Sequence, residues 1–212
     1  MDPHRLLERL QNSSPLRPPE CWAQGDSWMI YQEQFWDKFG VIHLDNVMTW
    51  HQDQIRMFGR KIPLPRLTAW YGDPDARYVY SGISNEPKAW ISELSDLRDV
   101  LEARLGIRFN SVLANRYADG SQHQGYHADD EKELGERPLI ASLSFGAERR
   151  FLVKKKTRGS EELSQTKTLD LRNGSLLLMG GDFQKEYVHA IARTKKNCEM
   201  RINLTFRLIH IL

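Results

Sequence analysis

Apolar residues recur at steps of three and four between Asn85 and Gly106, which predicts one long amphipathic helix. Pro87 lies near the expected start, because the first turn of a helix tolerates proline. Gly106 follows the last apolar residue as the expected C-terminal stop. The apolar positions of this period are Trp90, Leu94, Leu97, Leu101 and Leu105.

Beyond Gly106 the apolar period changes to two, which predicts β-strands. Asn173 and Gly174 separate two of the runs and both tolerate positive φ, so we expect a hairpin turn there. Many short strands behind one helix predict a mainly antiparallel barrel or sandwich with helical support. The runs cover residues 109–117, 139–145, 150–154, 167–171, 175–179 and 200–208.

The first 26 residues show little periodicity and contain Pro15, Pro18 and Pro19, which predicts a flexible N-terminal arm or a loosely packed lead-in. No internal repeat or long linker follows this arm. The length of 212 residues therefore predicts one domain, or one domain with a small lobe.

The composition is that of a folded protein, with 40% hydrophobic and 27% charged residues. Apolar stretches fall short of membrane-span length, and the first residues are too charged for a signal peptide. Cys21 and Cys198 are the only cysteines and neither belongs to a C-x-x-C pair, so we expect free thiols. We expect a soluble intracellular protein without membrane association, in the cytoplasm of a bacterium or the nucleus of a eukaryote.

The net charge of +2 is small, but the basic residues gather in three stretches. Such local patches are compatible with contact to a polyanion, and solvated loops have the same composition, so charge leaves both interpretations open. The stretches are Arg56 to Arg66, Lys154 to Arg158, and Lys195 with Lys196.

The last strand pattern separates two faces, because alternation places Arg201, Asn203, Thr205 and Arg207 on one side and apolar residues on the other. A solvent-facing polar side is the ordinary explanation. Two arginines flanking an amide and a hydroxyl also form a ladder suited to both carboxylates of a small dicarboxylic acid. Asn115 and Tyr117 share a face of an earlier strand in the same way.

A metal site is suggested by His127 and Asp129, followed about sixty residues later by His189. Two imidazoles and one carboxylate leave coordination positions of an iron ion open. The arginine ladder could bind an acidic cosubstrate in some of those positions. Each part alone is a weak signal, since isolated histidines are commonly surface or hydrogen-bonded residues. The combination predicts oxygen chemistry at iron.

Zinc is the competing metal, because His123 and His127 are spaced as two ligands on a helix would be. Gly120 and Gly125 argue against a helix over this segment, and zinc leaves the arginine ladder without a role. Iron is therefore the favoured prediction.

Several blocks in order resemble the AlkB family of iron(II)- and 2-oxoglutarate-dependent dioxygenases, over roughly residues 55–210. The resemblance implies an α+β, mainly β fold: a double-stranded β-helix (jelly-roll) core with a nucleotide-recognition lid. It divides the chain into the arm (1–26), the lid with its supporting helix (27–106) and the core (107–212). The blocks are Pro65–Gly72, Tyr78–Ser81, Asn115–Tyr117, His127–Asp130, Ile140–Gly146, Gly174–Met179, His189 and Arg201–Arg207.

The resemblance also implies roles for individual residues. His127, Asp129 and His189 would hold the iron. Asp130 would contact the exocyclic amine of a damaged base, although an exposed loop acid is the plain alternative. The cosubstrate 2-oxoglutarate would be bound by Arg201, Tyr117 and Asn203 at its distal carboxylate, by Arg207 and Asn115 near the metal, and with support from Thr205.

Aromatic residues of the lid blocks are candidates to hold an extruded base, since every base offers a face for stacking. These candidates are Trp70, Tyr78 and Tyr80, although aromatic residues in strands are most often core. Phe58 lies in a segment that resembles the hairpin with which a duplex-acting family member wedges the space left by the base. Arg60 would hold phosphate beside it, while a buried loop anchor is the alternative for Phe58.

The function that the resemblance implies is oxidative demethylation of N-alkylated bases, such as 1-methyladenine and 3-methylcytosine, using Fe(II), 2-oxoglutarate and O2. Formaldehyde, succinate and carbon dioxide would be released. The expected partners are alkylated DNA and also RNA, since Pro65–Gly72 resembles a relative that favours single strands and RNA; we expect a monomer. The alternative is a hydroxylase with the same cofactors acting on a protein or small molecule, which the aromatic lid disfavours.

Overall fold

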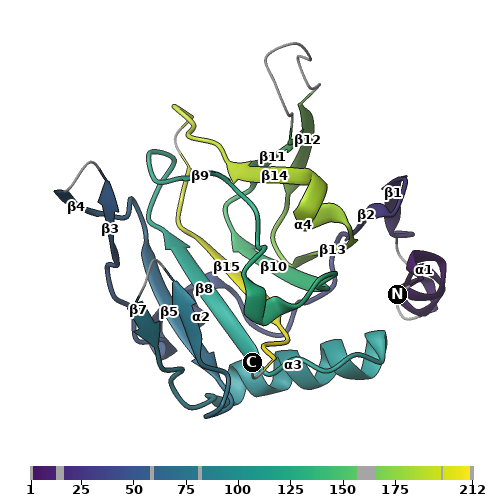
Figure 1. Ribbon diagram of the computed structural model, residues 1–212, viewed down its shortest axis with the longest axis horizontal. Helices are drawn as coiled ribbons and strands as arrows, with labels where there is room; N and C mark the ends of the chain where they lie inside the picture. The colour runs from purple at the N-terminus through teal and green to yellow at the C-terminus, as the bar shows by residue number, and fades with distance from the viewer. Residues whose placement is uncertain are drawn as a thin grey trace.

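Two antiparallel sheets face each other in the computed structural model, which describes residues 2–12, 17–57, 60–80, 83–156, 166–196 and 198–210 (Figure 1). The larger sheet has seven strands in the order β1 (Glu20–Gln24), β2 (Ser27–Gln32), β13 (Ser175–Gly181), β10 (Ile140–Gly146), β15 (Arg201–Arg207), β8 (Ser111–Tyr117) and β5 (Leu67–Gly72). The smaller sheet has four strands in the order β12 (Lys167–Leu171), β11 (Arg149–Lys155), β14 (Tyr187–Ile191) and β9 (Gln124–His127).

Two short hairpins and a few helices complete the described fold. One hairpin pairs β3 (Gln54–Met57) with β4 (Arg60–Pro63), and the other pairs β6 (Tyr78–Tyr80) with β7 (Ile83–Asn85). The helices are α1 (Pro3–Gln11), α2 (Val41–Val47), α3 (Ser92–Leu105), α4 (Phe183–Glu186) and the 3-10 turn η1 (Lys132–Leu134). None of these described helices is long and apolar enough to cross a membrane.

Apolar residues on both faces of the large sheet build two cores. Leu176 and Leu178 of β13 belong to the first core, with the leucines of α3 and α1, whereas Leu177 and Met179 belong to the second core between the sheets. The period of two in the sequence therefore distributes side chains to two buried layers rather than to a core and solvent. The candidate site lies in the layer between the sheets, beside the second core.

The helix predicted between Asn85 and Gly106 is found, but it begins later, at Ser92. Asn85 ends strand β7, and the N–H and C=O of Lys88 bond to Trp70 and Gly72 of β5, so this backbone is already used. Gly106 has φ 68° and caps the helix through a bond to Glu102, as the sequence predicts.

The N-terminal segment contains two elements that the periodicity did not predict. Helix α1 forms because Leu6 and Leu10, four residues apart, are buried against the first core, and the Asp2 carboxylate caps the N–H of His4. Strand β1 pairs with β2 along its length, across the expected boundary at residue 26. The division into arm, lid and core stays a prediction, and the large sheet draws strands from all three parts.

The turn at Asn173 and Gly174 is present, but it does not make the predicted hairpin. Gly174 has φ 71°, as a tight turn requires. The flanking strands do not pair with each other, because β12 bonds to β11 in the small sheet while β13 bonds to β10 and β2 in the large one. The turn therefore carries the chain from one sheet to the other.

Candidate metal centre and its two cavities

Three residues far apart in the sequence converge between the sheets. His127 ends β9, His189 lies directly opposite it on β14, and Asp129 follows two residues after His127. One side-chain atom from each lies within 4.8 Å of the others. Among the described residues, this group is the one able to hold a metal ion.

His189 is available as a neutral ligand. It is 4% exposed, and burial together with the neighbouring His127 lowers its pKa to about 3. Its Nδ1 is buried and has no hydrogen-bond partner within the described part of the chain. A buried nitrogen without a partner is costly, and a neutral, buried imidazole fits a metal ligand.

His127 presents one nitrogen to the site. Its Nδ1 donates to the carbonyl oxygen of Gly125 at 2.9 Å, which leaves the lone pair on Nε2. Nε2 lies 4.0 Å from Oδ1 of Asp129. The hydrogen bond on the far side of the ring thus orients His127 as in known metal sites.

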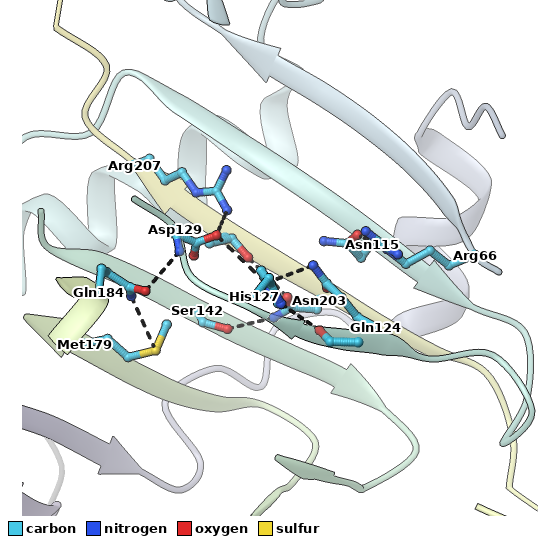
Figure 2. A network of polar contacts seen from close by, with 12 residues as sticks. Arg66, Asn115, Gln124, His127, Asp129, Ser142, Met179, Gln184, Asn203 and Arg207 are labelled. Carbon is cyan, nitrogen blue, oxygen red and sulfur yellow. Dashed lines mark hydrogen bonds and ion pairs between the residues drawn. The ribbon is translucent and has the colours of Figure 1, made fainter. Parts of the chain in front are cut away.

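Asp129 is held as a carboxylate by its neighbours. Burial would raise its pKa, but Arg207 and the two histidines outweigh this effect and keep the pKa below its usual value. Arg207 donates to Oδ1 of Asp129 at 2.7 Å, and the backbone N–H of Asp129 donates to Gln184 of α4 (Figure 2). A buried, ionised carboxylate completes a donor set of two imidazoles and one acid.

The predicted polar face of β15 lines an inner cavity next to this group. Arg201, Asn203, Thr205 and Arg207 all contribute to its wall, while Ile202, Leu204 and Phe206 pack in the first core. The alternative, a solvent-facing polar side, is wrong, because both arginines are buried. The alternation was predicted correctly, and the second sheet covers its polar side.

Arg201 has unused hydrogen-bond donors in this cavity, among the described residues. One Nη donates to the Ser144 hydroxyl at 3.0 Å, whereas Nε and the other Nη have no hydrogen-bond partner within the residues described. Burial lowers the pKa of Arg201 to about 10, so it remains a cation at neutral pH. A buried guanidinium with unused donors fits the carboxylate of a small acid.

Tyr117 and Asn203 support the arginine ladder rather than adding free donors. The guanidinium carbons of Arg201 and Arg149 lie over the Tyr117 ring, 5.4 and 5.8 Å from its centroid. The Asn203 amide donates to Ser142 and to the Leu143 carbonyl (Figure 2), so its nitrogen is fully used.

Asn115 and Thr205 complete the set of predicted cosubstrate residues. The Thr205 hydroxyl donates to the side-chain oxygen of Asn203 at 3.1 Å. Asn115 lines the inner cavity and accepts a hydrogen bond from Nε of Arg66 at 2.6 Å. The structure thus brings together Asn115, Tyr117, Arg201, Asn203, Thr205 and Arg207.

A second cavity, the outer cavity, adjoins the inner one at the candidate ligands. It shares His127, Asp129 and Arg207 with the inner cavity, so the metal-capable group lies at their junction. Trp70, buried on β5, forms part of the outer wall. The polar residues of the wall are His51, Asp53, Arg66, Thr68, Gln124 and Glu131, and its other apolar residues are Leu64, Ala69, Leu113 and Ala128.

Other predicted substrate residues are placed less completely. Tyr78 and Tyr80 lie on β6 and Arg60 on β4, with only their backbone described, and Phe58 lies outside the described residues. Asp130 is exposed, pairs with Lys156 at 2.9 Å, and lines neither cavity.

The zinc alternative finds no support in this geometry. His123 is not part of the metal-capable group in the described residues. Its Nδ1 accepts instead from Nε of Arg193 at 3.1 Å. His123 lies in the loop before β9 (Gln124–His127), so the four-residue spacing does not place both rings on one helical face.

The sequence patterns did not identify four residues of the site. Gln184 lies on α4 and Arg66 lies in the bend before β5, and strand alternation connects neither of them to the site. Arg149 donates to the carbonyls of Asp119, Gly120, Gln122 and Ala192, which holds the loop before β9. Gln124 contacts both His127 and Tyr117, although regular alternation would turn it away from His127.

A family model described as the 2OG-Fe(II) oxygenase superfamily matches residues 39–207. DNA oxidative demethylase ALKBH2 of Arabidopsis thaliana is 38% identical over 202 residues, covering 84% of this chain and 63% of that protein. The rat alpha-ketoglutarate-dependent dioxygenase alkB homolog 3 is 40% identical over 153 residues, covering 70% and 51%. The chain thus spans less than two thirds of these relatives.

The solved structure of OsALKBH1 matches 88% of this chain and 99% of that one, with a TM-score of 0.62 and 18% identity, which shows the fold alone. This match confirms the predicted jelly-roll fold class. The family match confirms iron(II), 2-oxoglutarate and O2 as the expected cofactors, and the donor set and the buried Arg201 fit them. The chain belongs to the 2OG-Fe(II) oxygenase superfamily and, within it, to the AlkB family.

Proposed function

We propose that this protein is a dioxygenase that removes methyl groups from N-alkylated bases in DNA, such as 1-methyladenine and 3-methylcytosine. The names of two relatives, a DNA oxidative demethylase and an alpha-ketoglutarate-dependent dioxygenase, support this reaction class. The observation that carries the proposal is the position of the His127, Asp129 and His189 group at the junction of two unlike cavities.

His127, Asp129 and His189 would hold the iron, and Arg201 would bind the distal carboxylate of 2-oxoglutarate in the inner cavity. Arg207 holds Asp129 and would lie near the carboxylate at the metal. When bound, iron and 2-oxoglutarate supply the oxidation of the N-methyl carbon by O2, with release of succinate, carbon dioxide and formaldehyde. The chain itself positions these groups and keeps them in a buried site.

The outer cavity would receive the base. Trp70 offers an aromatic wall, and Arg66 and Thr68 offer hydrogen-bonding groups for a base edge. The carboxyl groups of Asp53, Asp129 and Glu131 also line it. Because methylation at a ring nitrogen makes adenine or cytosine cationic, the carboxyl groups of Asp53 and Glu131 favour the alkylated base over the normal one, whereas Asp129 is paired with Arg207.

The competing proposal is oxidation of a protein or a small molecule by the same centre. The Trp70 wall and the carboxyl groups of the outer cavity favour the nucleic acid. An unmethylated oligonucleotide distinguishes the two: it competes with the substrate if nucleic acid is bound and has no effect if it is not. RNA as a substrate and the monomeric state stay predictions.

The test is formaldehyde release from oligonucleotides carrying 1-methyladenine or 3-methylcytosine, as single- and double-stranded DNA and as RNA, with iron(II) and 2-oxoglutarate. We expect turnover by the wild type and none by His127→Ala or Asp129→Ala, since each removes a ligand. His123→Ala is the matched control, because His123 lies outside the metal-capable group, and this variant should keep release. Full activity in both ligand variants would overturn the proposal.

A further inference from the structure

Gln124 is the residue that joins the candidate metal ligand to the cosubstrate cavity. Its side-chain oxygen accepts from the Tyr117 hydroxyl at 3.1 Å. Its nitrogen lies 2.8 Å from Nε2 of His127 (Figure 2). It lines both the inner and the outer cavity. One amide therefore contacts a group on each side of the site.

A bulge in β9 makes this contact possible. Residues three apart in a regular strand point to opposite faces. Here His127 lies opposite His189 and Gln124 lies opposite Ile191, so the register shifts by one residue between the two pairs. The shift turns Gln124 toward the same cavity as His127, and bulges re-aim side chains in this way beside active sites.

The proton positions follow from the partners. The carbonyl of Gly125 can only accept, so Nδ1 of His127 carries the proton and Nε2 carries the lone pair. That lone pair accepts from the Gln124 amide. It is also the lone pair that faces Asp129 and that a metal would need. The amide and the metal thus compete for one atom.

We propose that Gln124 is a positioning residue that gates metal loading. Its amide caps Nε2 of His127 in the metal-free protein and leaves when the metal binds, while the Tyr117 hydroxyl retains its oxygen. The inference rests on the metal site of the proposed function. Its consequence is that wild-type metal affinity is reduced by the cost of breaking one hydrogen bond, about 3- to 10-fold.

The test is a titration with Co²⁺ in the absence of 2-oxoglutarate, in which the visible absorption of the bound ion measures binding. Gln124→Leu removes the competing donor at similar volume, so Co²⁺ should bind about 3- to 10-fold more tightly. Tyr117→Phe frees the far end of the amide but leaves the cap, so a smaller gain is expected. Gln122→Leu is the matched control, because that side chain accepts from the Ala118 N–H instead, and its affinity should equal wild type.

A second measurement uses the wild type alone, so it does not require that any variant folds. Histidine-ring nitrogen NMR of the metal-free wild type should show His127 protonated at Nδ1, with Nε2 as a hydrogen-bonded acceptor. The opposite tautomer would overturn the inference.

The outcomes separate the two proposals. If Co²⁺ binds equally to wild type and His127→Ala, or binds neither, the metal site fails and the gate fails with it. If binding requires His127 but Gln124→Leu binds no more tightly than wild type, the metal site stands and only the gate is overturned.

Discussion

At the scale of residues, buried charge gathers at the candidate site. Asp129, Arg201 and Arg207 are each at most 4% exposed. Buried charges destabilise a fold unless partners compensate the lost hydration. Asp129 and Arg207 compensate each other, whereas Arg201 retains two nitrogens with no hydrogen-bond partner in the described part of the chain. We interpret that excess as a binding site for an acid.

Arg201→Lys tests this interpretation. Lysine keeps the charge but loses the planar fork that binds a carboxylate with two donors, so 2-oxoglutarate should bind about 10- to 100-fold more weakly. The measurement is calorimetric titration of 2-oxoglutarate into Mn²⁺-loaded protein. Ser144→Ala is the control, since it removes one partner of Arg201 and leaves the fork. Equal affinity in Arg201→Lys and wild type would refute the role.

At the scale of elements, short strands of unlike sheets present the chemistry. β15 supplies the arginine ladder from the large sheet, while β9 and β14 supply the two histidines from the small one. The hairpin of β3 and β4 stands apart from both sheets (Figure 1). Between these two strands in the sequence lies Phe58, for which the wedge role stays a prediction.

Phe58→Ala should therefore distinguish duplex from single-stranded substrates. An apolar wedge lowers the cost of unstacking a base pair, a cost that a single strand does not impose. We expect demethylation of double-stranded DNA to fall by about 10-fold or more, with little change on single strands. Ile62→Ala is the matched control, because it removes an exposed apolar side chain from the same hairpin. An equal loss on both substrates would exclude the wedge.

At the scale of the whole molecule, the candidate site joins the two sheets. Its ligands come from the small sheet and the loop after β9, and its cosubstrate wall comes from the large sheet. A ligand that bridges both binds the folded chain and not the unfolded one. Such binding raises the free energy of unfolding by mass action.

Loading with Mn²⁺ and 2-oxoglutarate should thus stabilise the fold. At 100 times the dissociation constant the gain is about 2.7 kcal/mol, or roughly 5–10 °C in Tm for a chain of this size. Differential scanning fluorimetry measures it, and EDTA should abolish it. His127→Ala should unfold at nearly the same temperature with and without the two ligands. A shift of wild-type size in that variant would show that the stabilisation arises elsewhere.

The sequence by itself determined the features that a few neighbouring residues encode. The period of two predicted that Arg201, Asn203, Thr205 and Arg207 share one face of β15. Gly106 marked the end of α3, because glycine adopts the left-handed conformation of a helix cap without steric cost. The types of the three candidate ligands were also readable, because metal preference follows from side-chain chemistry. These properties are local, so no knowledge of distant pairing was needed.

Only the tertiary structure decided which distant residues meet. The pairing of His189 with His127, the bulge that turns Gln124 inward and the covering of the ladder by a second sheet depend on register between strands far apart in sequence. α3 starts late because the backbone of Lys88 forms hydrogen bonds with a remote strand. The chain changes sheets at Gly174 because the two flanking strands pair with different remote strands. Local propensity cannot specify such contacts, because they stabilise the protein only after the distant strands have paired.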